Sequence, residues 1–240
     1  MNIYADIDNV CKGTIYSPQL LLGQTFEYIQ SDFFSLGNDF IPPGVTINIS
    51  LEKETTVDSF ILVGNNYMSA IVDFIRESVI IKTISFDYKE EMDIQHFENL
   101  LIDAVQIKLI EKDYTKNIII NYIYVGHRYK APRFIVEPEI EDEFLSKSNR
   151  SDFGYSYGLY GPVLRNYQLS FVRITQLEYE QLESYYKKVR NNVPHIVDIY
   201  PEAHEVITPL FCTVDNSVNR VKRPENNFYW NFELAFKEAK

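Results

Sequence analysis

Apolar and polar residues alternate over short runs in the first half of the chain. These runs occupy residues 45–49, 59–63, 70–75, 79–86, 104–110 and 117–125. Short runs separated by polar turns are typical of the strands of a β-sandwich or barrel. One segment departs from this pattern, because behind Asp93 the apolar residues recur at helical spacing, namely at Ile94, Phe97, Leu100 and Leu101. This spacing predicts a short helix or turn over residues 93–101.

The second half continues with strand-like runs at 165–172, 195–200 and 205–214. In the first of them Tyr167, Leu169 and Phe171 fall on one face, as in a half-buried strand. The run at 228–236 alternates without a break. Its apolar face consists of Phe228, Trp230, Phe232, Leu234 and Phe236. We therefore expect a second group of strands near the C-terminus.

A single long helix is predicted between these runs. Thr175 and Glu178 form a capping box, in which each side chain satisfies a free backbone N–H at the helix start. The apolar stripe that follows consists of Leu182, Tyr185, Tyr186 and Val189. Asn191, Asn192 and Pro194 then stop the helix. The predicted helix spans residues 175–190.

Two polar segments set the predicted connections. Gly64, Asn65 and Asn66 separate two strand-like runs and predict either a β-hairpin or another tight strand connection. Residues 137–150 begin with five acidic residues among seven, which predicts a solvated linker. The sequence thus predicts an all-β protein with one long helix, divided into a sandwich domain at 1–134, an acidic linker at 135–152 and a small β domain at 153–240.

Composition narrows the classes of partner. The net charge is −11, from 34 acidic and 23 basic residues, which argues against a nucleic-acid-binding protein. No apolar run approaches the length of about 20 residues that a membrane span needs. The first eight residues lack a basic region followed by an apolar run, so we expect no signal peptide. With Cys11 and Cys212 as its two cysteines, the chain is expected to assemble in a reducing cytoplasm.

Residues with catalytic or metal-binding chemistry do not form a recognisable motif. None of the four histidines forms a metal-ligand pair with another at helical spacing. His195 and His204 flank a strand-like run and either meet at a site or, as we favour, are two exposed loop residues. Cys212 lies in an apolar run, which predicts a buried, inert thiol. We therefore predict no enzyme activity, no catalytic residue, no metal site and no cofactor.

Two sequence phrases resemble a known family. Residues 57–66, and the strand at 119–125 followed by Gly126 and His127, resemble galactose-binding-like (discoidin-type) β-sandwiches, in particular those of bacteriophage minor tail and tail-tip proteins. The match covers residues 45–134. The strand, helix and final amphipathic strand of the C-terminal half resemble the small β-domains of distal tail and tail-hub proteins.

This resemblance implies a structural component of a phage virion, in the tail tip, baseplate or adaptor region. Its partners would be copies of itself in a ring and other tail proteins, and it would be assembled in the host cytoplasm. The alternative is a carbohydrate- or receptor-binding module for host attachment, with a host surface glycan as its ligand and a loop aromatic such as Tyr67 in contact with it. A hydrolase is a third and weaker hypothesis.

Aromatic residues are abundant, with 18 Tyr and 16 Phe against a single Trp. Tyrosine suits contact surfaces, because its hydroxyl stays hydrogen-bonded while its ring is buried. Tyr155, Tyr157 and Tyr160 alternate with glycines just after the acidic segment. We predict that they form an extended segment that contacts a neighbouring subunit or tail protein. The alternative is an internal strand of the second domain.

Overall fold

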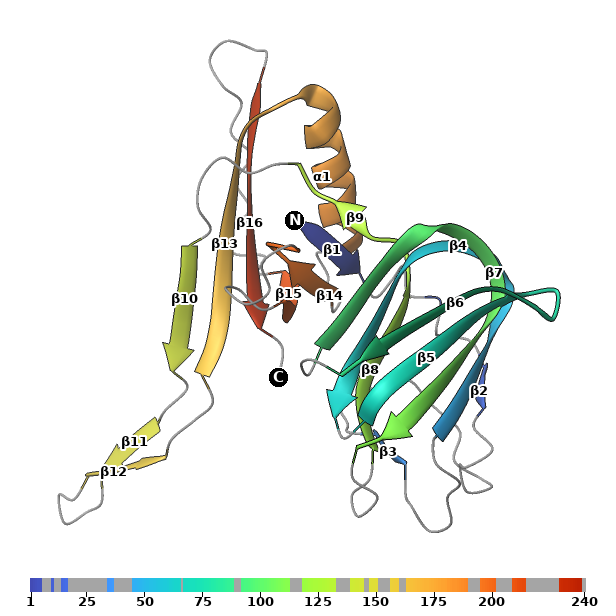
Figure 1. Cartoon of the computed structure of the whole chain (residues 1–240). Helices are drawn as coiled ribbons and strands as arrows, with labels where there is room; N and C mark the ends of the chain where they lie inside the picture. The colour runs from blue at the N-terminus through green and yellow to red at the C-terminus, as the bar shows by residue number, and fades with distance from the viewer. Residues whose placement is uncertain are drawn as a thin grey trace. The chain divides into compact units, whose positions relative to one another are not determined.

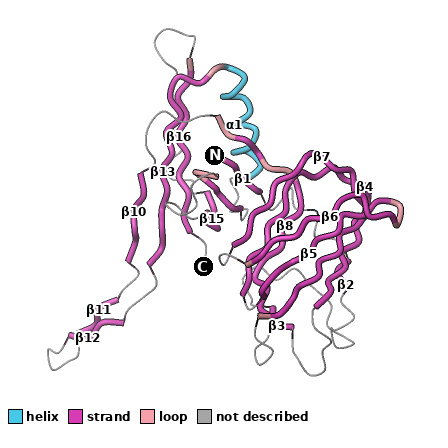
Figure 2. The backbone as a smooth tube through the Cα atoms, in the orientation of Figure 1, coloured by secondary structure: helices cyan, strands magenta, loops and turns pink. Residues whose placement is uncertain are grey.

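The chain is mostly antiparallel β-structure with one helix. The computed structural model describes residues 1–5, 10, 14–16, 34–36, 45–65, 67–88, 92–112, 118–132, 139–144, 147–150, 156–159, 163–189, 195–201, 209–214 and 229–238. Every strand pairing described among these residues is antiparallel, and α1 (Gln176–Val189) is their one α-helix (Figure 2). The predicted fold class is confirmed.

The chain divides into two compact units. We call Asp8–Arg128 the sandwich unit, and Met1–Ile7 together with Tyr129–Lys240 the helix unit. This division differs from the predicted boundaries, because β1 (Asn2–Ala5) pairs with strands that follow the sandwich in sequence. The segment predicted as a linker also differs, since β10 (Glu139–Phe144) pairs along its whole length with β13 (Val163–Ile174).

Seven strands build the sandwich unit in one continuous hydrogen-bonded sheet. They are β2 (Thr14–Tyr16), β3 (Phe34–Leu36), β4 (Val45–Asn65), β5 (Tyr67–Arg76), β6 (Val79–Asp87), β7 (Met92–Glu111) and β8 (Ile118–Gly126). The register divides this sheet into two layers. In the first layer β6, β5, the second half of β7, the first half of β4 and β2 lie in that order. In the second layer the first half of β7, the second half of β4, β8 and β3 follow one another.

The long strands β4 and β7 run through both layers and bend together between them, as Figure 1 shows. Their register shifts between Ser50 and Thr55, where four residues of β4 oppose Asp103 of β7 alone. Such bulges bend a strand and increase its twist, which lets one sheet fold over on itself. The buried side chains of both layers then pack into one core. Its largest members include Phe60, Phe74 and Tyr67.

The predicted helix or turn at 93–101 is wrong, because these residues belong to β7. A second register shift explains the misleading spacing. Val57 pairs with Leu100 and Ser59 pairs with His96, so three residues of β7 oppose Asp58 alone. Phe97 and Leu100 both pack against the core as a result. A bulge thus imitates the three-residue spacing of a helix.

The predicted turn at 64–66 joins strands that do not pair with each other. Gly64 and Asn65 end β4 in the second layer, Asn66 is outside the described residues, and β5 starts at Tyr67 in the first layer. The segment is therefore a tight connection between layers instead of a hairpin. The hairpin of this region joins β5 to β6 through Glu77 and Ser78, which have φ of 50° and 66°.

The helix unit contains a second seven-stranded sheet. It is formed, in order, by β10, β13, β16 (Trp230–Glu238), β15 (Leu210–Val214), β14 (His195–Asp198), β1 and β9 (Tyr129–Lys130). A separate pair, β11 (Lys147–Arg150) and β12 (Ser156–Leu159), forms its own two-stranded sheet. Helix α1 packs Leu182, Tyr185 and Val189 into the core of this unit.

The helix, its cap and the apolar faces of two predicted strands in this half are confirmed, whereas the predicted helix stop at residues 191–194, residues 205–208 and Phe228 lie outside the described residues. The backbone N–H of Thr175 donates to Glu178 Oε2 at 2.7 Å, and the backbone N–H of Glu178 donates to Thr175 Oγ1 at 3.3 Å, which is the capping box. Tyr167, Leu169 and Phe171 are buried on one face of β13. On β16 the predicted apolar face is buried at Phe232, Leu234 and Phe236, with Trp230 half-buried.

Candidate functional site

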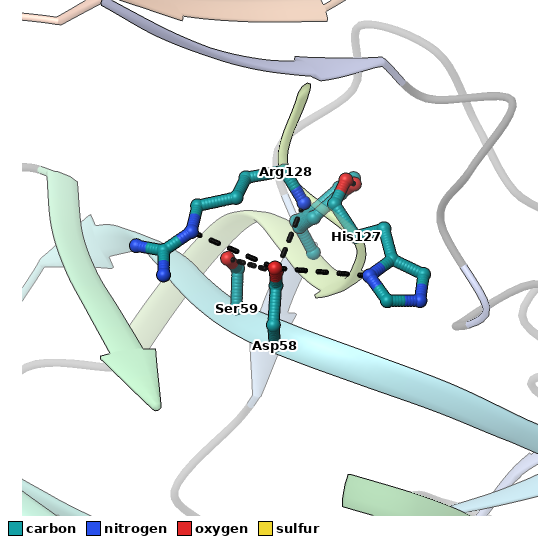
Figure 3. Close-up of polar contacts among 5 residues, drawn as sticks. Asp58, Ser59, His127 and Arg128 are labelled. Carbon is teal, nitrogen blue, oxygen red and sulfur yellow. Dashed lines mark hydrogen bonds and ion pairs between the residues drawn. The ribbon is translucent and has the colours of Figure 1, made fainter. Parts of the chain in front are cut away.

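A charged cluster surrounds Asp58 in the sandwich unit (Figure 3). Asp58 is the β4 residue at the bulge described above, and Gly126, the last residue of β8, pairs with its neighbour Ser59. His127 and Arg128 follow directly after β8. The bulge turns the Asp58 carboxylate toward the point where the chain leaves the sheet.

Four groups contact this carboxylate, which is 14% exposed. Ser59 Oγ donates to Asp58 Oδ1 at 2.7 Å, and the backbone N–H of Arg128 donates to the same oxygen at 2.9 Å. Arg128 Nε lies 3.5 Å and His127 Nδ1 3.7 Å from Asp58 Oδ2. The carboxylate therefore fixes the backbone of Arg128 and draws two basic side chains toward it.

The Asp58 cluster contains Ser, His and Asp, the three residue types of a hydrolase triad, but its hydrogen bonds do not connect them as in a triad. In a triad the histidine accepts the serine proton, and the carboxylate orients the histidine. Here Ser59 donates to Asp58 and not to His127, and Ser59 is fully buried. The arrangement provides no activated nucleophile. Its geometry fits a structural role at the end of β8.

A second polar cluster lies on the outer face of the first layer. Thr83, Asp73, Gln106 and Asn48 are directly opposite one another on four adjacent strands, β6, β5, β7 and β4. We call these four residues the polar row. On the last three strands the neighbours of the row in sequence are buried core residues, so the row faces away from the core.

Hydrogen bonds link the polar row across the strands. Thr83 Oγ1 donates to Asp73 Oδ1 at 2.6 Å, and Lys108 Nζ donates to Asp73 Oδ2 at 2.8 Å. Gln106 Nε2 donates to Asn48 Oδ1, also at 2.6 Å. Thr83 is exposed, and Gln106 and Asn48 are half-buried. The row with Lys108 thus presents both hydrogen-bond donors and acceptors on one sheet face.

Asp73 is the buried member of this row, with an exposed fraction of 3%. Burial acts to raise the pKa of its carboxyl, but the hydrogen bonds from Lys108 and Thr83 and the Lys108 charge act in the opposite direction. The net effect is a pKa below the ordinary value of 3.8. Asp73 is therefore held as a carboxylate, which orients Lys108 and Thr83.

Tyr67, predicted as an aromatic loop residue available to a ligand, is instead fully buried at the start of β5. Its hydroxyl donates to Asp93 Oδ2 at 2.6 Å, and its ring meets the ring of Tyr88 edge-on at 4.9 Å. Burial, followed by the hydrogen bond and charge of Asp93, raises the pKa of Tyr67 well above its ordinary value. Tyr67 belongs to the core and offers no surface to a sugar.

Aromatic residues of the helix unit also pack on one another. The Trp230 ring is stacked on Tyr179 with 4.3 Å between ring centroids, and Trp230 Nε1 donates to Gln176 Oε1 at 3.0 Å. These contacts attach the first turn of α1 to β16. His195 is likewise buried, between the rings of Tyr185 and Phe236. The favoured interpretation of His195 as an exposed loop residue is wrong.

Of the tyrosines predicted to contact a partner, one lies among the described residues. Tyr157 lies in β12 opposite Asn149, while Tyr155, Tyr160 and His204 are outside the described residues. The proposed contact role of the three tyrosines stays a prediction.

Cys212 is buried, and burial, with the Glu238 charge, raises the pKa of its thiol well above the ordinary value, which agrees with an inert thiol. Within the described ranges no group of three potential metal ligands occurs, and no helix is long and apolar enough to cross a membrane.

Comparison with known proteins finds similar structures but no similar sequence. No protein-family model matches the chain, and no curated protein matches it. Similar solved structures include SpGH29, at 10% identity and a TM-score of 0.43, and a mutant of chitosan-binding module 1 from a chitosanase/glucanase of Paenibacillus sp. IK-5, at 11% and 0.41. A third is the module CpGH89CBM32-5 of Clostridium perfringens in complex with GalNAc-β-1,3-galactose, at 9% and 0.38.

Each of these matches covers about half of this chain, namely 52%, 51% and 49%. The matched region is 29% of SpGH29 but 98% and 99% of the two modules. Structures similar to this chain thus include carbohydrate-binding modules. Likeness at these identities and TM-scores does not assign a family or a ligand to the chain. The three structures are not phage tail proteins, so the phage resemblance stays a prediction.

Proposed function

We propose that the chain is a carbohydrate-binding protein without enzyme activity, and that the polar row with Lys108 forms the centre of its binding surface. The observation that supports this proposal is the row itself. Four polar side chains on four adjacent strands lie side by side on one outward sheet face. The Gln106 and Asn48 amides, the Thr83 hydroxyl and the Lys108 ammonium group offer donors and acceptors, and each strand of the row is one strand-to-strand spacing from the next, while the Asp73 carboxylate is buried.

The chemistry of this surface fits a polyhydroxylated ligand. Each sugar hydroxyl both donates and accepts a hydrogen bond, and the amides of Gln106 and Asn48 do the same. The salt bridge between Asp73 and Lys108 fixes both charged groups before a ligand arrives, which lowers the entropy lost on binding. The acidic net charge of −11 opposes polyanionic ligands such as nucleic acids.

Binding assays on the 240-residue chain test this proposal. We suggest calorimetry with two probes, the neutral disaccharide GalNAc-β-1,3-galactose and chitosan oligosaccharides, together with a panel of bacterial surface polysaccharides. Gln106→Ala and Asn48→Ala each remove hydrogen bonds to the ligand, so each should weaken binding by roughly tenfold. Asn99→Ala is the matched control, because Asn99 is exposed on β7 outside the row.

Two results of these assays would contradict the proposal. If a glycan binds with equal affinity to wild type, Gln106→Ala and Asn48→Ala, the ligand contacts another surface. If no glycan in the panel binds the folded protein, carbohydrate binding itself is rejected. A weakening of chitosan binding alone by added salt would show that the net charge, and not the polar row, attracts that cationic polymer.

A structural role in a phage virion is the second candidate function, with the tail as its location. The observation that favours it is an apolar tip on the β5–β6 hairpin, where Val79, Ile80 and Ile81 are 62%, 54% and 42% exposed. Consecutive exposed apolar residues are typical of protein contact sites. Immunogold labelling or mass spectrometry of purified particles tests this role, since a tail component must be present in every particle. Its absence from particles would exclude this candidate.

A further inference from the structure

The strand β6 forms one edge of the sandwich unit. The order of the sheet ends at β6, which pairs with β5 and, among the described residues, with no strand on its other side. It is nine residues long and contains neither Gly nor Pro. A long edge strand of this kind exposes a row of backbone N–H and C=O groups that are able to pair with another strand.

The core is also incomplete at this edge. Ile84 and Phe86 of β6, with Tyr88 just beyond it, point toward the core and pack against it, yet all three stay only partly buried. A register shift near Ile81 separates these residues from the hairpin tip, and Lys82–Asp87 pairs regularly with β5. Among the residues that the structure describes, the regular segment is therefore both a sheet edge and a side of the hydrophobic core where apolar side chains are only partly covered.

From these features we infer that β6 pairs antiparallel with β6 of a second copy of this chain, about a twofold axis at Ser85. This register places Ile84 opposite Phe86 of the second copy on the core side of the sheet, and Thr83 opposite Asp87 of the second copy on the outer side. By symmetry each pair occurs twice. An apolar side chain thus meets an apolar one on the core side of the joined sheet.

Charge also favours antiparallel pairing of two copies of β6 over parallel pairing. Lys82 and Asp87 lie at opposite ends of the regular segment and are both exposed. In the antiparallel register Lys82 lies opposite Tyr88 of the second copy on the core side, whereas in-register parallel pairing would place Lys82 opposite Lys82 and Asp87 opposite Asp87. The twofold axis is perpendicular to the joined sheet, so both polar rows face the same side. If the proposed glycan-binding function is correct, the dimer would bind repeating glycans at two points.

The test is a charge-pairing experiment at Ser85, with the full chain studied by analytical ultracentrifugation. Wild type should sediment as a dimer. Ser85→Asp and Ser85→Lys each place like charges opposite each other at the axis and should weaken the dimer at least about tenfold. An equimolar mixture of the two variants should restore it, because only in the mixed dimer does the introduced carboxylate face the introduced ammonium group. Asn99→Asp adds the same charge at an exposed position outside the edge and should stay dimeric.

Ser85→Cys in a Cys11→Ser background provides a second measurement. Cross-strand neighbours lie about 4.5–5.5 Å apart between Cα atoms, which suits a disulfide, so mild oxidation should yield a cross-linked dimer. A wild-type monomer at all concentrations would overturn the inference. So would a dimer that Ser85→Asp and Ser85→Lys leave intact, since that dimer uses another surface. Neither outcome affects glycan binding by Gln106 and Asn48, so the two proposals fail separately.

Discussion

Single residues in this protein are most constrained where a polar group is buried. Asp73 is the clearest example, since its carboxylate lies under Thr83 and Lys108 on the outer sheet face. Such a group is stable in its ionised form only because its partners replace the water that burial removes. The same reasoning explains Tyr67 and Asp93, whose short hydrogen bond lies within the core of the sandwich unit. Both carboxylates are thus paired, as the energy of desolvation requires.

The first prediction concerns the pH dependence that Asp73 introduces. Its folded-state pKa lies below the ordinary value of 3.8, so its ionisation stabilises the folded protein above that value. This contribution is lost as the pH falls through the folded-state pKa. The difference in unfolding free energy between wild type and Asp73→Asn should therefore shrink between neutral pH and about pH 3. Urea unfolding at a series of pH values measures it. Glu98→Gln, at an exposed position, is the control and should show no such change.

The second prediction concerns the cap of α1. Thr175→Ala removes the hydroxyl that accepts the backbone N–H of Glu178, and also the contact of that hydroxyl with the Glu178 carboxylate. It should lower the free energy of unfolding by about 1 kcal/mol. Thr175→Ser keeps the hydroxyl and should recover most of this loss in the same chemical unfolding experiment. Equal losses for Ala and Ser would mean that the methyl group matters and the cap does not.

At the scale of elements, α1 depends more on its packing than on its cap. Leu182 is fully buried among the core residues of the helix unit. Leu182→Ala should therefore cost about 2–5 kcal/mol, more than Thr175→Ala. Thermal unfolding of the two variants side by side gives the comparison. Losses of equal size would contradict the burial of the apolar stripe. Leu177→Ala, at an exposed position of the same helix, is the matched control with little expected change.

The strands were predictable to different degrees, and the differences have a physical cause. Strict alternation identified β13 and β16, because each has one face on the core and one face outward. The alternation rule failed in β7, where the bulge opposite Asp58 inserts extra residues and moves Phe97 and Leu100 to the same side. A bulge depends on the partner strand, so its position is not visible in the sequence of one strand alone.

At the scale of the whole molecule, the division into units joins residues from opposite ends of the chain. Ile3 is fully buried in the core of the helix unit, and its strand β1 lies between β14 and β9. Nothing in the local sequence of residues 2–5 predicts that partner. Strand β1 pairs with β14 on one side and with β9 on the other. It thereby provides hydrogen-bond partners for backbone N–H and C=O groups of both strands.

This arrangement leads to a fourth prediction. Ile3→Ala should destabilise the helix unit by about 2–5 kcal/mol, although its partner in β14, Val197, lies in the last quarter of the chain. Hydrogen exchange should locate the effect, with faster exchange of the backbone amides of β14 and β15 and unchanged exchange in β5 and β7. Uniform acceleration in both units would show that the two units unfold together instead.

Local sequence patterns were sufficient to predict the helix, several strands and the class of fold. The capping box and apolar stripe of α1, the alternation of β13 and β16 and the all-β character all depend on residues close together in the chain, so their patterns are complete within a short window. The boundaries of the two units and the residues of the candidate site became visible only in the tertiary structure. The polar row joins Asn48, Asp73, Thr83 and Gln106 through strand register, and strand register depends on how the buried faces of distant segments fit together.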